Sequence, residues 1–259
     1  MTKSWWSSSS LSSTSFRKRM NESSELKKSH IILSIDPAPM PNLRNFVKKI
    51  IGLLQENICA IKLNFHIILP FSQTDLLEIN RLAHLYKLQS IADIKLNDIA
   101  STNEIAIHYL LEMGFDSVIV NPFIGKNALR SAVQQTHKKN CGVIALIYMS
   151  HPGAKEGFGV NVINWHNNKT IGMYKLFLKN ALEAKVDGIV VGATYTDILK
   201  EVSRYKKVPI YSPGLGKQGG NIQLAARHGT DYFIIGRSII ESRDPLKEAK
   251  KLQRIVQKL

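Results

Sequence analysis

The sequence predicts an α/β fold of the (β/α)8 TIM-barrel class, a single domain preceded by a disordered N-terminal extension. From residue 31 onward, short apolar runs rich in β-branched residues alternate with amphipathic stretches of about 10 to 17 residues. Eight such runs occur, and closing eight parallel strands into a barrel leaves no exposed sheet edge. An open doubly wound sheet gives a similar alternation, so the polar residues at the strand ends carry more weight.

Eight segments are expected to form the strands. They are residues 31–36, 58–63, 90–95, 117–121, 142–147, 187–191, 208–211 and 231–235. Between them, helical spacing of apolar residues, as in Leu76, Ile79 and Ala83, predicts the outer helices, and a glycine such as Gly114 is typical of a helix end.

Residues 1–29 differ from the rest and are expected to form a disordered, serine-rich leader, with residues 30–259 as the barrel domain. Eight serines fall within the first fifteen positions, and apolar periodicity is absent. Because no acidic residue precedes Glu22, an organelle transit peptide is one alternative. A second alternative takes Met20 as the true start of the chain.

Composition limits the partners. The formal charge of +15, from 35 Lys and Arg against 20 Asp and Glu, attracts an anionic metabolite, nucleic acid or acidic membrane. The basic residues form no aromatic-interleaved stripe, so nucleic acid is not the expected partner. No apolar run reaches ~18 residues, so neither a spanning helix nor a membrane partner is expected. Two cysteines in expected buried strands, Cys59 and Cys141, are typical of free thiols in a reducing cytoplasm.

Ionisable residues gather where the first three expected strands end. Asp36 ends the first strand, Lys62 lies near the end of the second, and Asp93, Lys95 and Asp98 follow one another at the end of the third. Asp93 and Lys95 are two residues apart and therefore point to the same face of a strand. Asp98 alone is better explained as a helix cap. So many charges at a barrel mouth nevertheless indicate a functional site, because the active sites of barrels lie at this end.

The later strand ends carry glycines and further polar residues. The fifth strand leads into Ser150 and His151 and a long loop rich in Gly and Asn that runs to about residue 169. Such a loop is more often functional than idle, although His151 itself is more often a turn residue. Four glycines within residues 214–220 and the following Arg237 predict an anion site, since barrels commonly bind phosphate after strands seven and eight.

Four motifs together resemble the orotidine 5′-phosphate decarboxylase family in its short single-domain form. They are Asp93-x-Lys95-x-x-Asp98, Met149-Ser150-His151-Pro152-Gly153, Pro213-Gly214-x-Gly216-x-Gln218-Gly219-Gly220 and Gly236-Arg237-Ser238. The resemblance covers residues 31–259. The first motif is shared with magnesium-dependent sugar-phosphate decarboxylases and aldolases of the same superfamily. Those relatives have an acidic residue at the end of the second strand, where this chain has Lys62.

The resemblance implies conversion of orotidine 5′-monophosphate to UMP and CO2 without a cofactor or metal, as the last step of pyrimidine nucleotide synthesis, in the cytoplasm. It implies a catalytic set of Lys95, Asp93, Asp98 and Lys62, with Lys95 stabilising and protonating a carbanion at C6. Asp98 and Thr102 are expected to enter the neighbouring site of a homodimer. Substrate contacts are expected from Asp36, Lys62, Ser150, Pro213, Gly214, Gly216, Gln218, Gly219, Gly236 and Arg237. A non-catalytic barrel that binds nucleotides or RNA stays as the alternative of another class.

Overall fold

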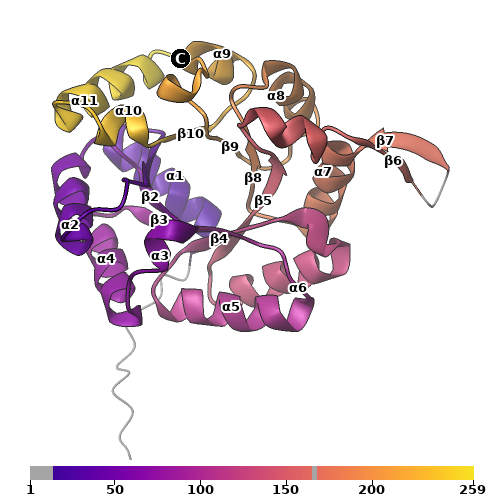
Figure 1. Cartoon of the computed structure of the whole chain (residues 1–259), viewed down its shortest axis with the longest axis horizontal. Helices are drawn as coiled ribbons and strands as arrows, with labels where there is room; N and C mark the ends of the chain where they lie inside the picture. Colours follow the sequence, from indigo (N-terminus) through magenta and orange to yellow (C-terminus); the bar gives the residue numbers. More distant parts are fainter. Residues whose placement is uncertain (1–13, 165–167) are drawn as a thin grey trace, which may run out of the picture.

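The chain folds into a closed barrel of eight parallel strands surrounded by helices (Figure 1). A computed structural model describes residues 14–164 and 168–259. The barrel strands are β1 (Ile31–Ile35), β2 (Ala60–Asn64), β3 (Gln89–Leu96), β4 (Ser117–Val120), β5 (Gly142–Tyr148), β8 (Gly188–Val191), β9 (Ile210–Ser212) and β10 (Tyr232–Ile235). β1 pairs with both β2 and β10, which closes the cylinder. The eight expected strands are confirmed, each within two residues of its predicted ends.

The outer layer consists of helices that return the chain from one strand to the start of the next. They are α2 (Leu43–Leu54), α4 (Gln73–Leu85), α5 (Ala100–Glu112), α6 (Lys126–His137), α7 (Met173–Ala184), α8 (Thr196–Ser203), α9 (Ile222–Arg227) and α11 (Pro245–Val256). Short elements lie in the loops that follow the strands: α3 (Phe65–Ile68), η1 (Pro122–Ile124), η2 (Pro152–Glu156), η3 (Gly216–Gln218) and α10 (Arg237–Ile240). The core lies inside the strands and between strands and helices, as the fully buried Ile32, Ile61 and Val143 illustrate.

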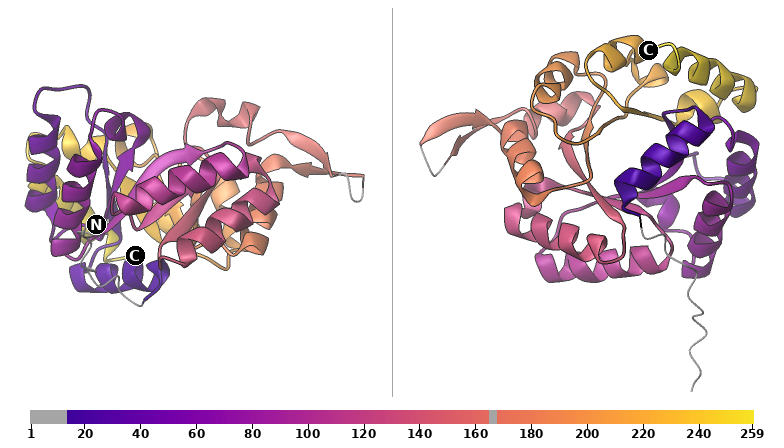
Figure 2. Two further views of the ribbon diagram at one scale, coloured as in Figure 1. Left: turned by 90° about the horizontal axis from the view of Figure 1, so that it is seen from below. Right: turned by 180° about the vertical axis from the view of Figure 1, so that it is seen from behind.

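The expected disorder of the leader is wrong for residues 16–27. They form helix α1 (Phe16–Lys27), which lies across the end of the barrel where the strands begin (Figure 2, right). Phe16 and Met20 are fully buried, and Phe16 packs on Gly142, where a Cβ atom would lie 2.4 Å from the ring. Arg19 donates to Asp116 at 2.9 Å. A chain starting at Met20 would lose the contacts of Phe16 and Arg19. Residues 1–13 of the leader lie outside the described residues.

Three aspartates that precede strands fasten the same end of the barrel. Each aspartate accepts a hydrogen bond from a backbone N–H at the start of the strand one earlier in the barrel. Each also contacts a basic side chain of the connection that leads into that earlier strand. The triads are Asp116 with Ser90 N (2.8 Å) and His84 (2.8 Å), Asp187 with Val143 N (2.9 Å) and His137 (2.9 Å), and Asp231 with Ile210 N (2.8 Å) and Lys206 (2.7 Å). These contacts satisfy strand-end N–H groups that lack a ladder partner.

A two-stranded hairpin extends from the loop after β5. It consists of β6 (Asn161–Asn164) and β7 (Lys169–Gly172) and projects away from the barrel (Figures 1 and 2). The sequence predicted only a loop here, because these strands are largely polar and show no clear alternation. Within the described residues, no helix is long and apolar enough to cross a membrane.

Candidate active site

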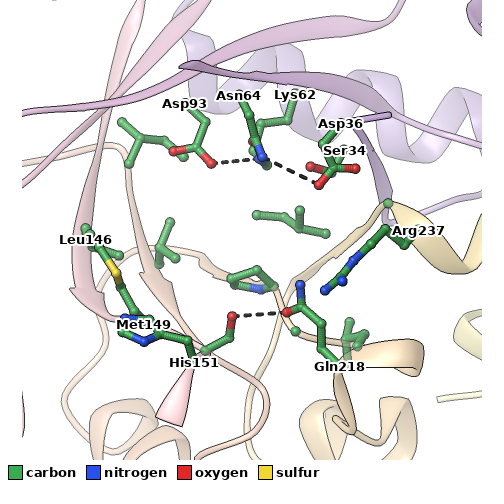
Figure 3. A pocket seen from close by; sticks show the side chains of 18 of the residues that line it. Ser34, Asp36, Lys62, Asn64, Asp93, Leu146, Met149, His151, Gln218 and Arg237 are labelled. Carbon is green, nitrogen blue, oxygen red and sulfur yellow. Dashed lines mark hydrogen bonds and ion pairs between the residues drawn. The ribbon is translucent and has the colours of Figure 1, made fainter. Parts of the chain in front are cut away.

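A pocket opens at the end of the barrel where the strands finish, and all eight barrel strands or the residues that follow them contribute to its wall. Its apolar floor includes Ile119, Leu146, Val190 and Ile234. The polar side chains stand above this floor in two groups that face each other across the opening (Figure 3). The position agrees with the rule that barrels place their chemistry at the carboxyl ends of the strands.

The first group centres on the carboxylate of Asp93. Lys62 donates to one of its oxygens and Lys95 to the other, both at 2.7 Å. Asp93 and Lys62 are 7% and 3% exposed, whereas the Lys95 side chain is 37% exposed and borders the open pocket. Burial raises the pKa of Asp93, but the charges of Lys62 and Lys95 together outweigh burial, so the pKa falls below its ordinary value. Asp93 is therefore a carboxylate that holds two ammonium groups.

Lys95 has an unusual backbone conformation. Its φ angle is +47°, in the left-handed region that non-glycine residues seldom adopt, and the pairing of β3 with β4 shifts register between Ala92 and Leu96. Residues held in such conformations cost of order 1 kcal/mol and cluster at functional sites. In this irregular stretch the Lys95 side chain contacts Asp93. The alternation of side chains along a regular strand predicts that the two residues share a face, but it does not predict the irregular backbone.

Asn64 extends this group toward Asp36. Lys62 donates to the side-chain oxygen of Asn64, and the Asn64 amide donates to Asp36 at 3.5 Å. Burial raises the pKa of Asp36, while Lys62, His66 and Arg237 oppose that rise. The inner Asp36 oxygen is buried and has no hydrogen-bond partner among the described residues. Asn64 was missed in the sequence, where a single polar residue at the end of a strand is indistinguishable from an ordinary helix cap.

The second group belongs to the loops after β5, β9 and β10. Ser150 donates to the Gln218 side chain at 3.2 Å, and Arg237 reaches toward the opening beside Gln218 (Figure 3). The loop bends at Gly214 and Gly216, whose φ angles are +91° and +69°. Both lie against other side chains, because a Cβ atom at Gly216 would come within 2.3 Å of the Ser238 hydroxyl. Side chains larger than glycine would displace this turn.

Lys217 has a partner outside the pocket. Its ammonium group pairs with Glu241 at 2.7 Å, and its backbone N–H donates to the Ser238 hydroxyl at 3.1 Å. These contacts tie the glycine-rich loop to α10 and the residues just after it. His151 borders the pocket but is exposed, and its backbone oxygen accepts from Tyr195 at 2.8 Å.

The structure brings most of the expected site residues to one pocket. Those that line it are Asp36, Lys62, Asp93, Lys95, Ser150, Pro213, Gly214, Gln218, Gly236 and Arg237. Gly216 and Gly219 shape the loop without lining the pocket. Asp98 and Thr102 are exposed and lie outside it in the single chain, and Asp98 accepts from the N–H of Ile99 at 2.7 Å.

The pocket offers little to a metal ion. Among the residues that the structure describes, no three His, Cys, Asp or Glu side chains are placed to hold one. The two carboxylates of the site, Asp36 and Asp93, lie on either side of the buried ammonium of Lys62. A cation in that position repels a divalent metal rather than helping to bind it.

Comparison with known proteins identifies the family to which the chain is related. Residues 29–252 match the sequence profile of the family described as Orotidine 5′-phosphate decarboxylase / HUMPS family. The orotidine 5′-phosphate decarboxylase of Methanocaldococcus jannaschii is 32% identical over 217 residues, covering 83% of this chain and 94% of that protein. The same enzyme of Methanococcus maripaludis is 35% identical over 199 residues, covering 76% and 84%.

Solved structures show the same fold. The Methanocaldococcus jannaschii orotidine 5′-monophosphate decarboxylase, complexed with the inhibitor BMP, superimposes with a TM-score of 0.76 at 29% identity over 87% of this chain and 97% of that one. A putative orotidine-monophosphate decarboxylase from Toxoplasma gondii gives a TM-score of 0.81 at 21% identity, over 95% and 96%. From the matched profile, the identity to curated relatives and the shared barrel, we conclude that this chain belongs to the orotidine 5′-phosphate decarboxylase / HUMPS family.

Proposed function

We propose that this protein decarboxylates orotidine 5′-monophosphate to UMP and CO2, the last step of pyrimidine nucleotide synthesis. The observation that carries the proposal is the Lys95 ammonium group, held 2.7 Å from Asp93 at the border of an open pocket. Across that pocket stand Arg237 and a glycine-rich loop, which suit a phosphate. The curated relatives named above act on this substrate, which supports the same substrate here.

The reaction requires stabilisation of a carbanion. The bond from C6 to the carboxylate breaks and its electron pair stays on C6, in an orbital that the pyrimidine carbonyls do not delocalise. We assign Lys95 two roles: its positive charge stabilises the developing carbanion, and its proton then moves to C6. Asp93 fixes the position of that ammonium group in advance, and Lys62 holds the other oxygen of Asp93. Preorganised charge of this kind is usually the largest single contribution to catalysis.

The remaining polar residues bind the parts of the substrate that do not react. We assign Asp36, Lys62 and Asn64 to the ribose, Ser150 and Gln218 to the pyrimidine, and Arg237 with the glycine-rich loop to the 5′-phosphate. The Ser150–Gln218 hydrogen bond already joins the loop after β5 to the loop after β9. Phosphate binding can therefore draw these loops over the base and exclude water, so that remote contacts contribute to the rate.

We further propose that the active enzyme is a homodimer in which Asp98 and Thr102 complete the partner's site. Both are exposed at the rim formed by the loops after β2, β3 and β4. Four large apolar side chains around the same rim are also exposed: Phe65 (56%), Leu69 (64%), Ile99 (68%) and Phe123 (50%). Exposed apolar residues gathered in one region are typical of an interface. Light scattering with and without a UMP analogue measures the expected dimer.

The domain organisation follows from the same proposal. Residues 30–259 form the catalytic barrel, and α1 closes its base as part of the same unit. The two buried thiols, Cys59 and Cys141, are unpaired, which agrees with a reducing cytoplasm.

The direct test is the fall in orotidine monophosphate absorbance when protein is added in the presence of excess EDTA. Turnover that persists in EDTA supports the proposal and excludes a magnesium-dependent sugar-phosphate enzyme, the second candidate within the family. Binding of UMP without any turnover would instead indicate a nucleotide-binding barrel.

A further inference from the structure

The end of the barrel opposite the pocket carries a basic surface that the proposed reaction does not use. At this end a turn precedes each strand, and five of the eight turns expose lysine. These are Lys28 before β1, Lys87 before β3, Lys138 and Lys139 before β5, Lys185 before β8 and Lys207 before β9. We call these lysines, together with the exposed face of α1, the basal surface. It points away from the pocket, so it cannot help an anionic substrate to enter.

Most of this positive charge is not neutralised. Lys28, Lys87, Lys138, Lys185 and Lys207 make no ion pair with any described residue. The aspartates that precede β4, β8 and β10 already pair with His84, His137 and Lys206, as described above. On α1, Glu22 lies 3.8 Å from Lys18, and the exposed Glu25 accepts from the Asn21 amide at 3.4 Å. Glu112 and Glu56 are paired with Lys139 and Lys27.

Large apolar side chains are exposed beside these lysines. They are Leu26 (61%), Leu85 (72%), Tyr205 (63%) and Leu259 (55%), and each lies within two residues of an exposed lysine: Lys28, Lys87, Lys207 and Lys258. Lysines near helix C-termini are favourable for the helix dipole, which accounts for part of the charge. The dipole does not account for exposed leucines at the same turns, because leaving them in water is unfavourable.

We propose that the basal surface is a docking site for an anionic lipid bilayer. Lysines around the barrel circumference would contact acidic headgroups, while the leucine and tyrosine side chains beside them enter the headgroup and acyl boundary. Helix α1 lies flat across this end and the pocket opens on the opposite end (Figure 2). A bound molecule therefore keeps its active site open to solution.

Two features favour lipid over nucleic acid. The lysines are distributed around a closed ring of strands, which matches a plane of charge better than the line of phosphates in a strand. Proteins that bind single-stranded nucleic acid without sequence preference combine basic grooves with aromatic side chains on which the bases stack. Here three of the four exposed apolar residues are leucines. The sequence analysis expected no membrane partner because no apolar run is long enough to span a bilayer. Peripheral binding to a membrane surface does not require such a segment.

The experiment is sedimentation of the full-length protein with vesicles. Vesicles of phosphatidylcholine with about a third phosphatidylserine are expected to bind it at low salt, and phosphatidylcholine alone is not. Binding is expected to weaken as salt rises toward physiological strength, where the Debye length is about 8 Å. Equal pelleting with both kinds of vesicle, or with neither, would overturn the proposal.

Charge-reversal variants locate the surface. The triple variant Lys87→Glu, Lys185→Glu, Lys207→Glu is expected to partition at least about a hundredfold more weakly. Each basic residue near an anionic membrane contributes a factor of about five, and the new glutamates add repulsion. The matched control, Lys49→Glu, Lys200→Glu, Lys250→Glu, changes the net charge equally but lies on the outer helices. It is expected to retain most of the binding. Equal loss in both variants would show non-specific attraction and would contradict the proposal.

A second pair of variants separates lipid from RNA. Leu26→Ser with Leu85→Ser leaves the charge unchanged and is expected to weaken vesicle binding severalfold. The control Ile163→Ser with Leu224→Ser changes two exposed apolar residues on the hairpin and on α9 and is not expected to weaken it. If a polyuridine RNA binds as tightly as the vesicles, depends on the same lysines and ignores the leucines, the surface binds nucleic acid and the lipid proposal is wrong. Decarboxylase activity in solution should be unchanged in all four variants, so this test is independent of the proposed reaction.

Discussion

The carboxylate of Asp93 accepts hydrogen bonds from Lys62 and Lys95 at the same distance, 2.7 Å, one on each oxygen. One buried carboxylate thus fixes two ammonium groups, of which only Lys95 borders the open pocket with substantial exposure. Lys62 in turn contacts Asn64, which reaches Asp36. The proposed ribose and carboxylate subsites are therefore parts of one network.

This network predicts that Asn64 positions Lys62 for the substrate. Asn64→Ala removes the acceptor for Lys62 and the donor to Asp36, and kcat/KM should fall about tenfold, the value of one hydrogen bond to a charged group. The neighbouring exposed Asn97 offers a matched control, Asn97→Ala, with unchanged kinetics. Steady-state kinetics measure both, and an unaltered kcat/KM in Asn64→Ala would show that the network does not matter to catalysis.

Arg237 is predicted to bind the 5′-phosphate. Arg237→Ala should raise KM by about 10- to 100-fold, because a charge-assisted contact of ~1.5–3 kcal/mol is lost. Arg243→Ala, at an exposed residue not placed in the pocket, controls for the loss of one positive charge. An unchanged KM in Arg237→Ala would show that Arg237 does not bind the phosphate.

Helix α1 is predicted to contribute to the stability of the barrel. Phe16→Ala leaves a cavity above Gly142 and should lower the free energy of unfolding by about 3–5 kcal/mol. The exposed neighbour Lys18→Ala should change it by less than about 0.5 kcal/mol. Denaturant unfolding measures both values, and a Phe16→Ala protein as stable as the original would mean that α1 is not docked in solution.

The pair of His137 and Asp187 predicts a pH dependence of stability. The hydrogen bond to Asp187 raises the pKa of His137 above its ordinary value of 6.5 in the folded state. The stabilisation is therefore fully present below about pH 6.5 and disappears as pH rises through the higher folded pKa. Because the His137 side chain is 46% exposed, solvent screening keeps the contribution below about 1 kcal/mol. His137→Gln should be more destabilising at acid than at alkaline pH in denaturant titrations, and the opposite trend would refute the assignment.

The sequence was informative where one physical rule acts alone. Eight β-branched runs required eight strands, and strand ends brought Asp36, Lys62 and Asp93 to one rim because parallel strands of a barrel all finish there. The left-handed backbone of Lys95 depends on a register shift with β4, which no local pattern encodes. Helix α1 was missed because Phe16 and Met20 are the only buried apolar residues in its polar sequence, and their partners lie far along the chain.

The central claim is that the Lys95 ammonium group performs the chemistry, and the turnover of Lys95→Ala tests it most directly. We expect the variant to fold, to bind UMP and to lose many orders of magnitude in the decarboxylation rate, because both the charge beside C6 and the proton that C6 receives are removed. Single-turnover absorbance measurements with excess enzyme give that rate. Retention of even about a tenth of the original turnover, a difference of only ~1.4 kcal/mol in the barrier, would contradict the account.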